Sequence, residues 1–204
     1  MFLGKPWVDR VTAGLAALPF GYVLWVDLGV GHLTIPRIAI LFQLSLLILT
    51  LLIRVPPVRV TTNPLYWVVA LVASYYGFLT ASFIGSGRPL APGWLTDGLS
   101  VVGVLLDVFA RLHLGRNIGF VPAQRRLVLS GPYRVVRHPI YSALFLAEVC
   151  VIFENYSARN FALSLVFLGL FVIKSLMEES FLRQDPRYAQ YMREVRYRWI
   201  PGLA

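Results

Sequence analysis

Six apolar runs, separated by Pro, Gly, Arg or Asn, constrain the fold of this chain more than any other feature. They cover residues 11–30, 38–53, 65–84, 99–110, 140–153 and 161–173. A helix of roughly 20 residues spans the hydrocarbon core of a bilayer, and the first and third runs reach that length. The last two runs are shorter, so we expect them to borrow flanking residues or to pack as a short hairpin.

Composition supports a membrane protein. Hydrophobic residues make up 57% of the chain and charged residues only 14%, a balance that water-soluble domains rarely show. The sequence therefore predicts an all-α integral membrane bundle with five or six transmembrane helices.

Lysines and arginines gather on alternate loops. If six runs cross and the N-terminus is cytoplasmic, all but Arg37, Arg88 and Arg159 of the nineteen fall on the cytoplasmic side, as the positive-inside rule expects. Topology thus explains the net charge of +9 better than nucleic-acid binding does. We expect a multi-pass protein whose functional face and termini are cytoplasmic. Lysine occurs only at Lys5 and Lys174, which suggests a GC-rich prokaryotic genome and an inner-membrane location.

The chain reads as a single membrane domain, residues 1–204, without internal repeats. Its first part, residues 1–98, has short loops and is interpreted as scaffold. Residues 99–204 contain a polar connection, RLHLGRNIGFVPAQRRLVLSGPYRV, that is too long for a simple link between neighbouring helices. We expect this cytoplasmic loop to be functional.

A second polar segment follows the last apolar run. Asp185 and Pro186 are typical of a helix N-cap and first helical position. Apolar residues then recur at helical spacing, which predicts an amphipathic helix: Tyr188, Tyr191, Met192, Val195 and Trp199. This C-terminal helix either lies at the membrane surface or docks on the polar loop.

The stretch GPYRVVRHPIYSALF, residues 131–145, places cations at the mouth of the fifth run. Pro139 fits the first turn of a helix, with His138 as its cap. A helix N-terminus attracts anions, and Arg134 and Arg137 add full charges beside it. The sequence predicts an anion site here, unless these arginines only contact lipid phosphates.

Two adjacent glutamates, Glu178 and Glu179, follow the last apolar run. Neighbouring residues on a helix point roughly 100° apart, so they cannot face one partner equally. One is expected to hold a ligand cation while the other pairs with Lys174 or Arg183. A solvated acidic helix end is the alternative.

Two further acids lie within apolar runs. Asp107 stands four residues before Arg111, a spacing that favours an ion pair. Glu148 has no such neighbour, so it is a functional candidate unless a hydrogen bond explains it.

Several classes of chemistry lack their motifs. The chain has no dinucleotide-binding glycine motif, no Walker loop and no zinc-protease motif. Cys150 is the only cysteine, which excludes an internal disulfide and a cysteine-based zinc cluster. We expect no metal site.

The combination of G-P-Y, R-H-P-x-Y, E-E and Y-x-x-Y in residues 99–203 resembles the isoprenylcysteine carboxyl methyltransferase family and its relatives among membrane phospholipid methyltransferases. Two positions depart from the usual pattern. Ala143 stands where glycine is common, and Lys174 lies near a position where arginine is common.

The resemblance implies an integral membrane enzyme that binds S-adenosylmethionine without a Rossmann domain. It implies that Glu178 or Glu179 binds the cofactor's α-amino group and that Arg137 holds a substrate carboxylate. The remaining cofactor contacts would come from Leu127, Val128, Gly131, Tyr133, His138 and Tyr141.

The residues agree with this chemistry. S-adenosylmethionine is a zwitterion, so its pocket needs an acid for the ammonium group and donors for the carboxylate. A carboxylate acceptor is ionised at neutral pH and needs no general base. The first hypothesis is therefore methyl transfer to the carboxylate of a lipophilic, prenylcysteine-like molecule whose chain stays in the bilayer.

Two other functions stay open. A phospholipid amine acceptor must lose a proton, for which Glu148 or one of the paired glutamates is the nearest base. A non-catalytic scaffold would use the basic loop only to grip anionic membrane lipids.

Overall fold

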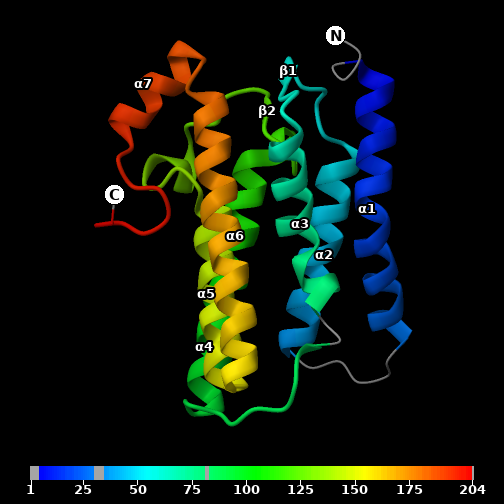
Figure 1. Cartoon of the computed structure of the whole chain (residues 1–204), viewed down its shortest axis with the longest axis vertical. Helices are drawn as coiled ribbons and strands as arrows, with labels where there is room; N and C mark the ends of the chain where they lie inside the picture. Colours follow the sequence, from blue (N-terminus) through cyan, green and yellow to red (C-terminus); the bar gives the residue numbers. More distant parts are fainter. Residues whose placement is uncertain (1–4, 30–34, 81–82, 204) are drawn as a thin grey trace.

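The computed structural model describes residues 5–29, 35–80 and 83–203, and most of this chain is helical, 72%. Six long helices stand side by side (Figure 1). They are α1 (Pro6–Gly29), α2 (Ile35–Leu52), α3 (Pro64–Thr80), α4 (Gly93–Leu114), α5 (Pro139–Glu154) and α6 (Ala158–Leu182). The predicted all-α class is confirmed.

Most of each apolar run lies in a different long helix, although Ile53 follows α2 and residues 83 and 84 follow α3. The end of the first run, Val30, and residues 81 and 82 of the third lie outside the described residues. The short elements connect the helices: β1 (Arg59–Val60), η3 (Gly115–Asn117), β2 (Ala123–Gln124), η4 (Gly131–Arg134) and α7 (Pro186–Glu194). Figure 1 shows β1, β2 and α7 at the same end of the bundle as the beginning of α1.

Two helical segments, Gly93–Asn117 and Ala158–Leu182, are long and apolar enough to cross a membrane. The sequence instead favoured the runs in α1 and α3 for full crossings. The difference arises because α6 continues past its apolar run, and Lys174 and Glu179 on this extension are buried within the bundle. These two segments are candidate membrane spans, and five or six crossings remain a prediction.

Large apolar side chains cover the outside of the helices. Such a surface is unusual for a protein surrounded by water and suits contact with lipid. More than half exposed are Leu15, Leu18, Tyr22 and Trp25 on α1, Leu105 and Leu112 on α4, and Leu165 and Val166 on α6.

The core between α1, α2 and the long loop is aromatic and aliphatic. Phe20 of α1 packs against Phe78 at a ring-centroid distance of 5.1 Å and against Phe120 at 5.7 Å. The Tyr75 hydroxyl donates a hydrogen bond to the carbonyl of Ala16 at 2.9 Å. These contacts fix α3 and the loop against α1.

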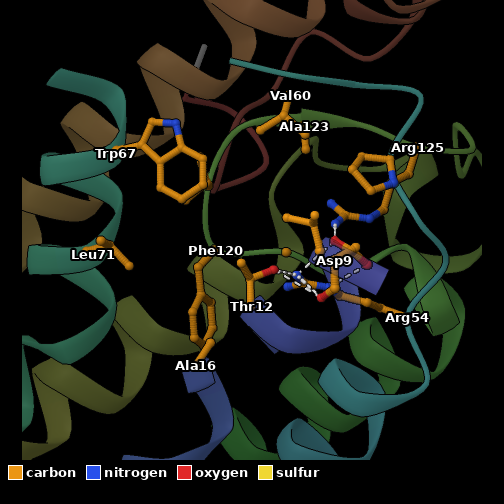
Figure 2. Close-up of a pocket in the computed structure, with 14 residues that line it drawn as sticks. Asp9, Thr12, Ala16, Arg54, Val60, Trp67, Leu71, Phe120, Ala123 and Arg125 are labelled. Carbon is orange, nitrogen blue, oxygen red and sulfur yellow. Dashed lines mark hydrogen bonds and ion pairs between the residues drawn. The ribbon is translucent and has the colours of Figure 1, made fainter. Parts of the chain in front are cut away.

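The long loop is also held by β1, whose residues Arg59 and Val60 pair with β2 in antiparallel register. Beneath this sheet, Asp9 of α1 binds the guanidinium groups of Arg54 at 2.8 Å and Arg125 at 3.3 Å (Figure 2). Burial, together with the nearby charge of Arg54, lowers the pKa of Arg125 to about 10, so it stays charged at neutral pH. Two cations therefore share one carboxylate at the base of the loop.

The C-terminal segment closes over the start of α5. The expected capping of α7 is confirmed, because the Asp185 side chain accepts from the N–H of Arg187 and Pro186 is the first helical residue. The helix ends at Glu194, earlier than the predicted spacing through Trp199. After it, Val136 and Tyr197 form a parallel bridge, and the N–H of His138 donates to the carbonyl of Arg198 at 2.8 Å.

The apolar face of α7 docks on the protein. Tyr188, Tyr191 and Val195 are buried and pack against Leu127 of the long loop. The Tyr191 hydroxyl also donates to a backbone carbonyl of η4 at 2.7 Å. Of the two sequence interpretations, docking on the loop is the one observed.

Candidate functional site

A cavity of about 570 Å³ lies between the helices and the long loop, within the size range of small-molecule sites. Seven of the ten residues predicted for a site line it: Leu127, Val128, Tyr133, Arg137, His138, Tyr141 and Glu178. The cavity thus connects the turn that carries Arg137 and His138 with Glu178, the first glutamate of the pair. Gly131, Glu148 and Glu179 are not among its lining residues.

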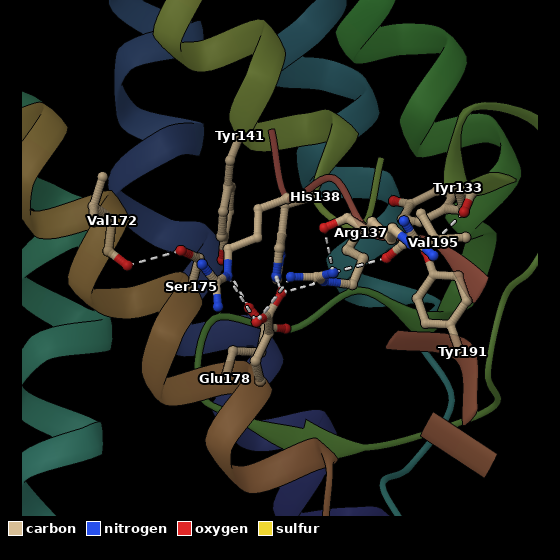
Figure 3. A network of polar contacts seen from close by, with 12 residues as sticks. Tyr133, Arg137, His138, Tyr141, Val172, Ser175, Glu178, Tyr191 and Val195 are labelled. Carbon is tan, nitrogen blue, oxygen red and sulfur yellow. Dashed lines mark hydrogen bonds and ion pairs between the residues drawn. The ribbon is translucent and has the colours of Figure 1, made fainter. Parts of the chain in front are cut away.

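Glu179 is the centre of a buried ion-pair cluster beside the cavity. Figure 3 shows Arg137 and His138 within this network of polar contacts. The Glu179 carboxylate binds Nε of Arg137 at 2.6 Å and Nε of Arg198 at 2.9 Å. The Nε2 atom of His138 lies 3.2 Å from the same carboxylate. The sequence expected the second glutamate to pair with Lys174 or Arg183, but its partners come from α5 and the C-terminal segment.

The guanidinium group of Arg137 is fully engaged. Besides Glu179, it donates to the backbone carbonyls of Val195 at 2.7 Å and Arg196 at 2.8 Å. Its charge and donors therefore serve to lock the turn to the C-terminal segment. The carboxylate-binding role that the resemblance implied for Arg137 would require breaking these contacts.

Glu178 faces the cavity and has a different environment. The Tyr141 hydroxyl donates to its carboxylate at 3.0 Å. The Tyr141 ring stacks on His138, with centroids 5.2 Å apart and planes 3° apart. The two glutamates therefore have different surroundings, since Glu179 is inside the ion-pair cluster and Glu178 lines the cavity.

The turn around η4 shows the structural roles of two predicted residues, His138 and Gly131. His138 is the N-cap residue of α5 and Pro139 is its first residue, as predicted, although the His138 side chain makes no capping hydrogen bond. Gly131 has a φ of +59°, and a Cβ atom there would collide with the ring of His113. Glycine is therefore required at position 131 because of its backbone conformation and because His113 packs closely against it.

Tyr133 is buried under α7, and this burial raises the pKa of its hydroxyl.

The two intramembrane acids have structural partners. Asp107 accepts from Nε of Arg111 at 2.6 Å, so the predicted ion pair is confirmed. Glu148 accepts a hydrogen bond from Ser164 of α6. The structure therefore does not bring Glu148 into the cavity with the other candidate residues.

Sequence reasoning missed the contribution of α1, α2 and α3. Seven residues of these helices line the cavity: Phe20, Val23, Leu47, Ala73, Ser74, Gly77 and Phe78. The part interpreted as scaffold thus forms a wall of the site. No motif marks these residues, because all of them except Ser74 contribute shape rather than a specific functional group.

Sequence reasoning also missed Lys174 as a residue of the cavity. Lys174 lines the cavity and is 5% exposed. A lysine at the end of an apolar run is a signal that could have identified it.

The cavity is polar at the loop end and apolar deeper in the bundle. Glu178 lies near the end of α6, next to the loop, whereas Phe167 is three turns deeper on the same helix. Gly77 lies deep on α3, is exposed, and has no atom within 4 Å of the position its Cβ would take. The cavity therefore extends along α3 at least as far as this glycine.

Residues 93–188 match the model of the phospholipid methyltransferase family. The match begins at the first residue of α4 and ends within α7, so it contains the long loop, the turn and both glutamates. No curated protein matches the chain.

This family belongs to the superfamily that includes the isoprenylcysteine carboxyl methyltransferases. The match indicates a membrane methyltransferase, and such enzymes generally use S-adenosylmethionine. It agrees with the broader resemblance seen in the sequence and leaves the acceptor open.

Proposed function

We propose that this protein transfers a methyl group from S-adenosylmethionine to the carboxylate of a lipophilic acid at the cytoplasmic face of the membrane. The observation that carries the proposal is the single cavity that joins Glu178 and the polar loop to an apolar interior that extends to Gly77. A water-soluble cofactor and a membrane-bound acceptor can meet in such a cavity without either leaving its own medium.

The residues present fit the cofactor. Glu178 offers a carboxylate for its ammonium group, and Tyr141 holds that carboxylate in place. Arg125 and Arg126 line the loop end and suit its carboxylate, while Leu127 and Val128 offer an apolar surface. When bound, S-adenosylmethionine supplies an electrophilic methyl group on a sulfonium.

The protein's part in the reaction is positioning and exclusion of water. The carboxylate oxygen of the acceptor forms a bond to the methyl carbon as the carbon–sulfur bond breaks, and the electron pair of that bond remains on sulfur. No proton moves, so no general base is needed. Among the described residues, this agrees with the use of Glu179 and Glu148 in internal contacts.

The charge of the lining favours an anionic acceptor. Five basic residues line the cavity against two acids, Glu178 and Asp185. The basic residues are Arg111, Arg125, Arg126, Arg137 and Lys174.

A phospholipid amine is the second candidate acceptor, favoured by the description of the matching family. That acceptor would have to lose a proton, and Glu178 is the only acid of the predicted set that faces the cavity.

Product chemistry tests the proposal. Purified protein in lipid nanodiscs is incubated with S-adenosylmethionine labelled in the methyl group and a lipid extract. A methyl ester releases its label in mild alkali, whereas an N-methyl group does not. Label released by alkali supports the carboxylate acceptor, alkali-stable label in the lipid fraction identifies the amine, and absence of any transfer or cofactor binding contradicts the enzyme assignment.

A further inference from the structure

Lys174 places a buried cation in the wall of the cavity. Its Nζ atom donates a hydrogen bond to Oγ of Ser74 at 2.9 Å, which links α6 to α3. Three aromatic rings surround the same atom, with centroids at 5.2 Å for Phe171 and 5.7 Å for Phe120 and Tyr141. These ring faces stabilise the positive charge and hold it at a fixed position.

The charge of Lys174 differs from that of the other buried cations in the wall. Arg111 is paired with Asp107 and Arg137 with Glu179, while Arg125 shares Asp9. Within the described residues, no carboxylate forms an ion pair with Lys174.

The nearest acid along α6 is Glu178, one turn away, whose carboxylate is held by Tyr141. An ammonium group has three donors, and Ser74 takes one. Burying a charge without a partner costs free energy. An anion that enters the cavity and pairs with Lys174 therefore stabilises this site.

The position of Lys174 in the cavity indicates the chemical class of that anion. Lys174 lies between Glu178, at the polar end, and Phe171 and Phe167, which line the apolar part. A molecule that places an oxyanion on Lys174 therefore has its apolar chain among these rings. The acidic group of this molecule then lies one helical turn from Glu178, whose carboxylate suits the ammonium group of the cofactor.

We infer that Lys174 is the specificity-determining residue of the acceptor site and binds the carboxylate of a lipophilic acid. This inference rests on the proposed function. The ammonium group orients the carboxylate that is to be methylated, and Ser74 keeps Nζ in place. A protonated amine at the same position would meet a like charge, so Lys174 selects acids over amines.

Binding rather than turnover tests this role. The probes are N-acetyl-S-farnesylcysteine and its primary amide, which differ only in the charge of the head group. Their affinities are measured in phosphatidylcholine nanodiscs for wild-type protein, Lys174→Gln and Lys174→Arg. In the same samples, binding of S-adenosylhomocysteine reports the folded cofactor site.

The wild-type protein is expected to bind the acid at least about tenfold more tightly than the amide. Lys174→Gln is expected to remove that preference, and Lys174→Arg to keep it, while S-adenosylhomocysteine affinity stays the same in both. Ser74→Ala is expected to weaken the preference without removing it, since the cation remains but is less well fixed.

Equal affinity of acid and amide in the wild-type protein overturns the inference, as does unchanged acid preference in Lys174→Gln. A lipid phosphate is the other oxyanion of suitable chemistry, so phosphatidylethanolamine and diacylglycerol form a second pair of probes. If Lys174→Gln weakens only phosphatidylethanolamine binding, the carboxylate assignment is wrong. Failure to bind S-adenosylhomocysteine in the wild-type protein would contradict the proposed function instead.

Discussion

Nε of Arg137 lies 2.6 Å from Oε1 of Glu179, in a contact that joins the start of α5 to α6 and is buried on both sides. The same arginine donates to carbonyls of the C-terminal segment. Three parts of the chain thus meet at one ion pair. The residue before Glu179, Glu178, lines the cavity, so the two adjacent glutamates have different environments.

Glu179→Gln is predicted to destabilise the folded protein by about 3–5 kcal/mol, because it leaves the buried Arg137 without a counter-charge. Thermal unfolding in detergent, followed by tryptophan fluorescence, measures this loss.

Glu178→Gln is the matched variant: it is expected to unfold at the wild-type temperature but to bind S-adenosylhomocysteine more weakly. Unchanged stability in Glu179→Gln would show that the cluster contributes little.

Tyr141→Phe is predicted to weaken S-adenosylhomocysteine binding about tenfold, because it removes the hydrogen bond that orients the Glu178 carboxylate. Stacking on His138 is retained, so the fold should persist. Isothermal titration in nanodiscs gives the affinity. Tyr76→Phe removes a comparable hydroxyl contact, to a backbone carbonyl of α6, without touching the cavity and should bind normally. Equal affinities for both variants would argue against the assigned role of Glu178.

Gly77→Leu is predicted to raise the KM for a lipophilic acceptor while leaving cofactor affinity unchanged. Gly77 lines the cavity, so the new side chain has open space and occupies part of the apolar interior rather than colliding with the fold. Initial rates over a range of acceptor concentrations measure the change. Gly169→Leu is the control, since this helical glycine also has open space but does not line the cavity. An unchanged KM would show that the acceptor reaches the site by another route.

Gly131→Ala is predicted to destabilise the protein by at least about 1–2 kcal/mol, because it combines a left-handed backbone with a collision against His113. Adding His113→Ala should restore part of the loss by removing the collision. Gly115→Ala has a similar φ of +55° but no neighbour within 4 Å, so it reports the backbone cost alone. If all three variants unfold at the same temperature, packing around His113 is not a constraint.

Local features of the fold could be predicted from the sequence because their physical causes are local. Pro139 begins α5, Asp185 caps α7, and Asp107 pairs with Arg111 one turn away. Each depends on residues within four positions of one another. The apolar runs likewise indicate helices, because an apolar helix satisfies its own backbone hydrogen bonds.

The partners of the buried charges could not be predicted in the same way. The contact of Lys174 with Ser74 depends on α3 lying beside α6, and that of Arg137 with Glu179 depends on how the C-terminal segment folds back. Helical periodicity says which residues share a face but not which face of another helix they meet. The same limit explains why the walls supplied by α1 to α3 were interpreted as scaffold.

The parallel bridge between Val136 and Tyr197 has a consequence for how the molecule is made. The turn that carries Arg137 and His138 is synthesised well before the backbone groups that pair with it. During translation, α5 can insert while its leading turn still lacks these partners. The turn is held in place only after Tyr197 and Arg198 have left the ribosome, so a nascent chain that stalls earlier has this turn without its backbone partners.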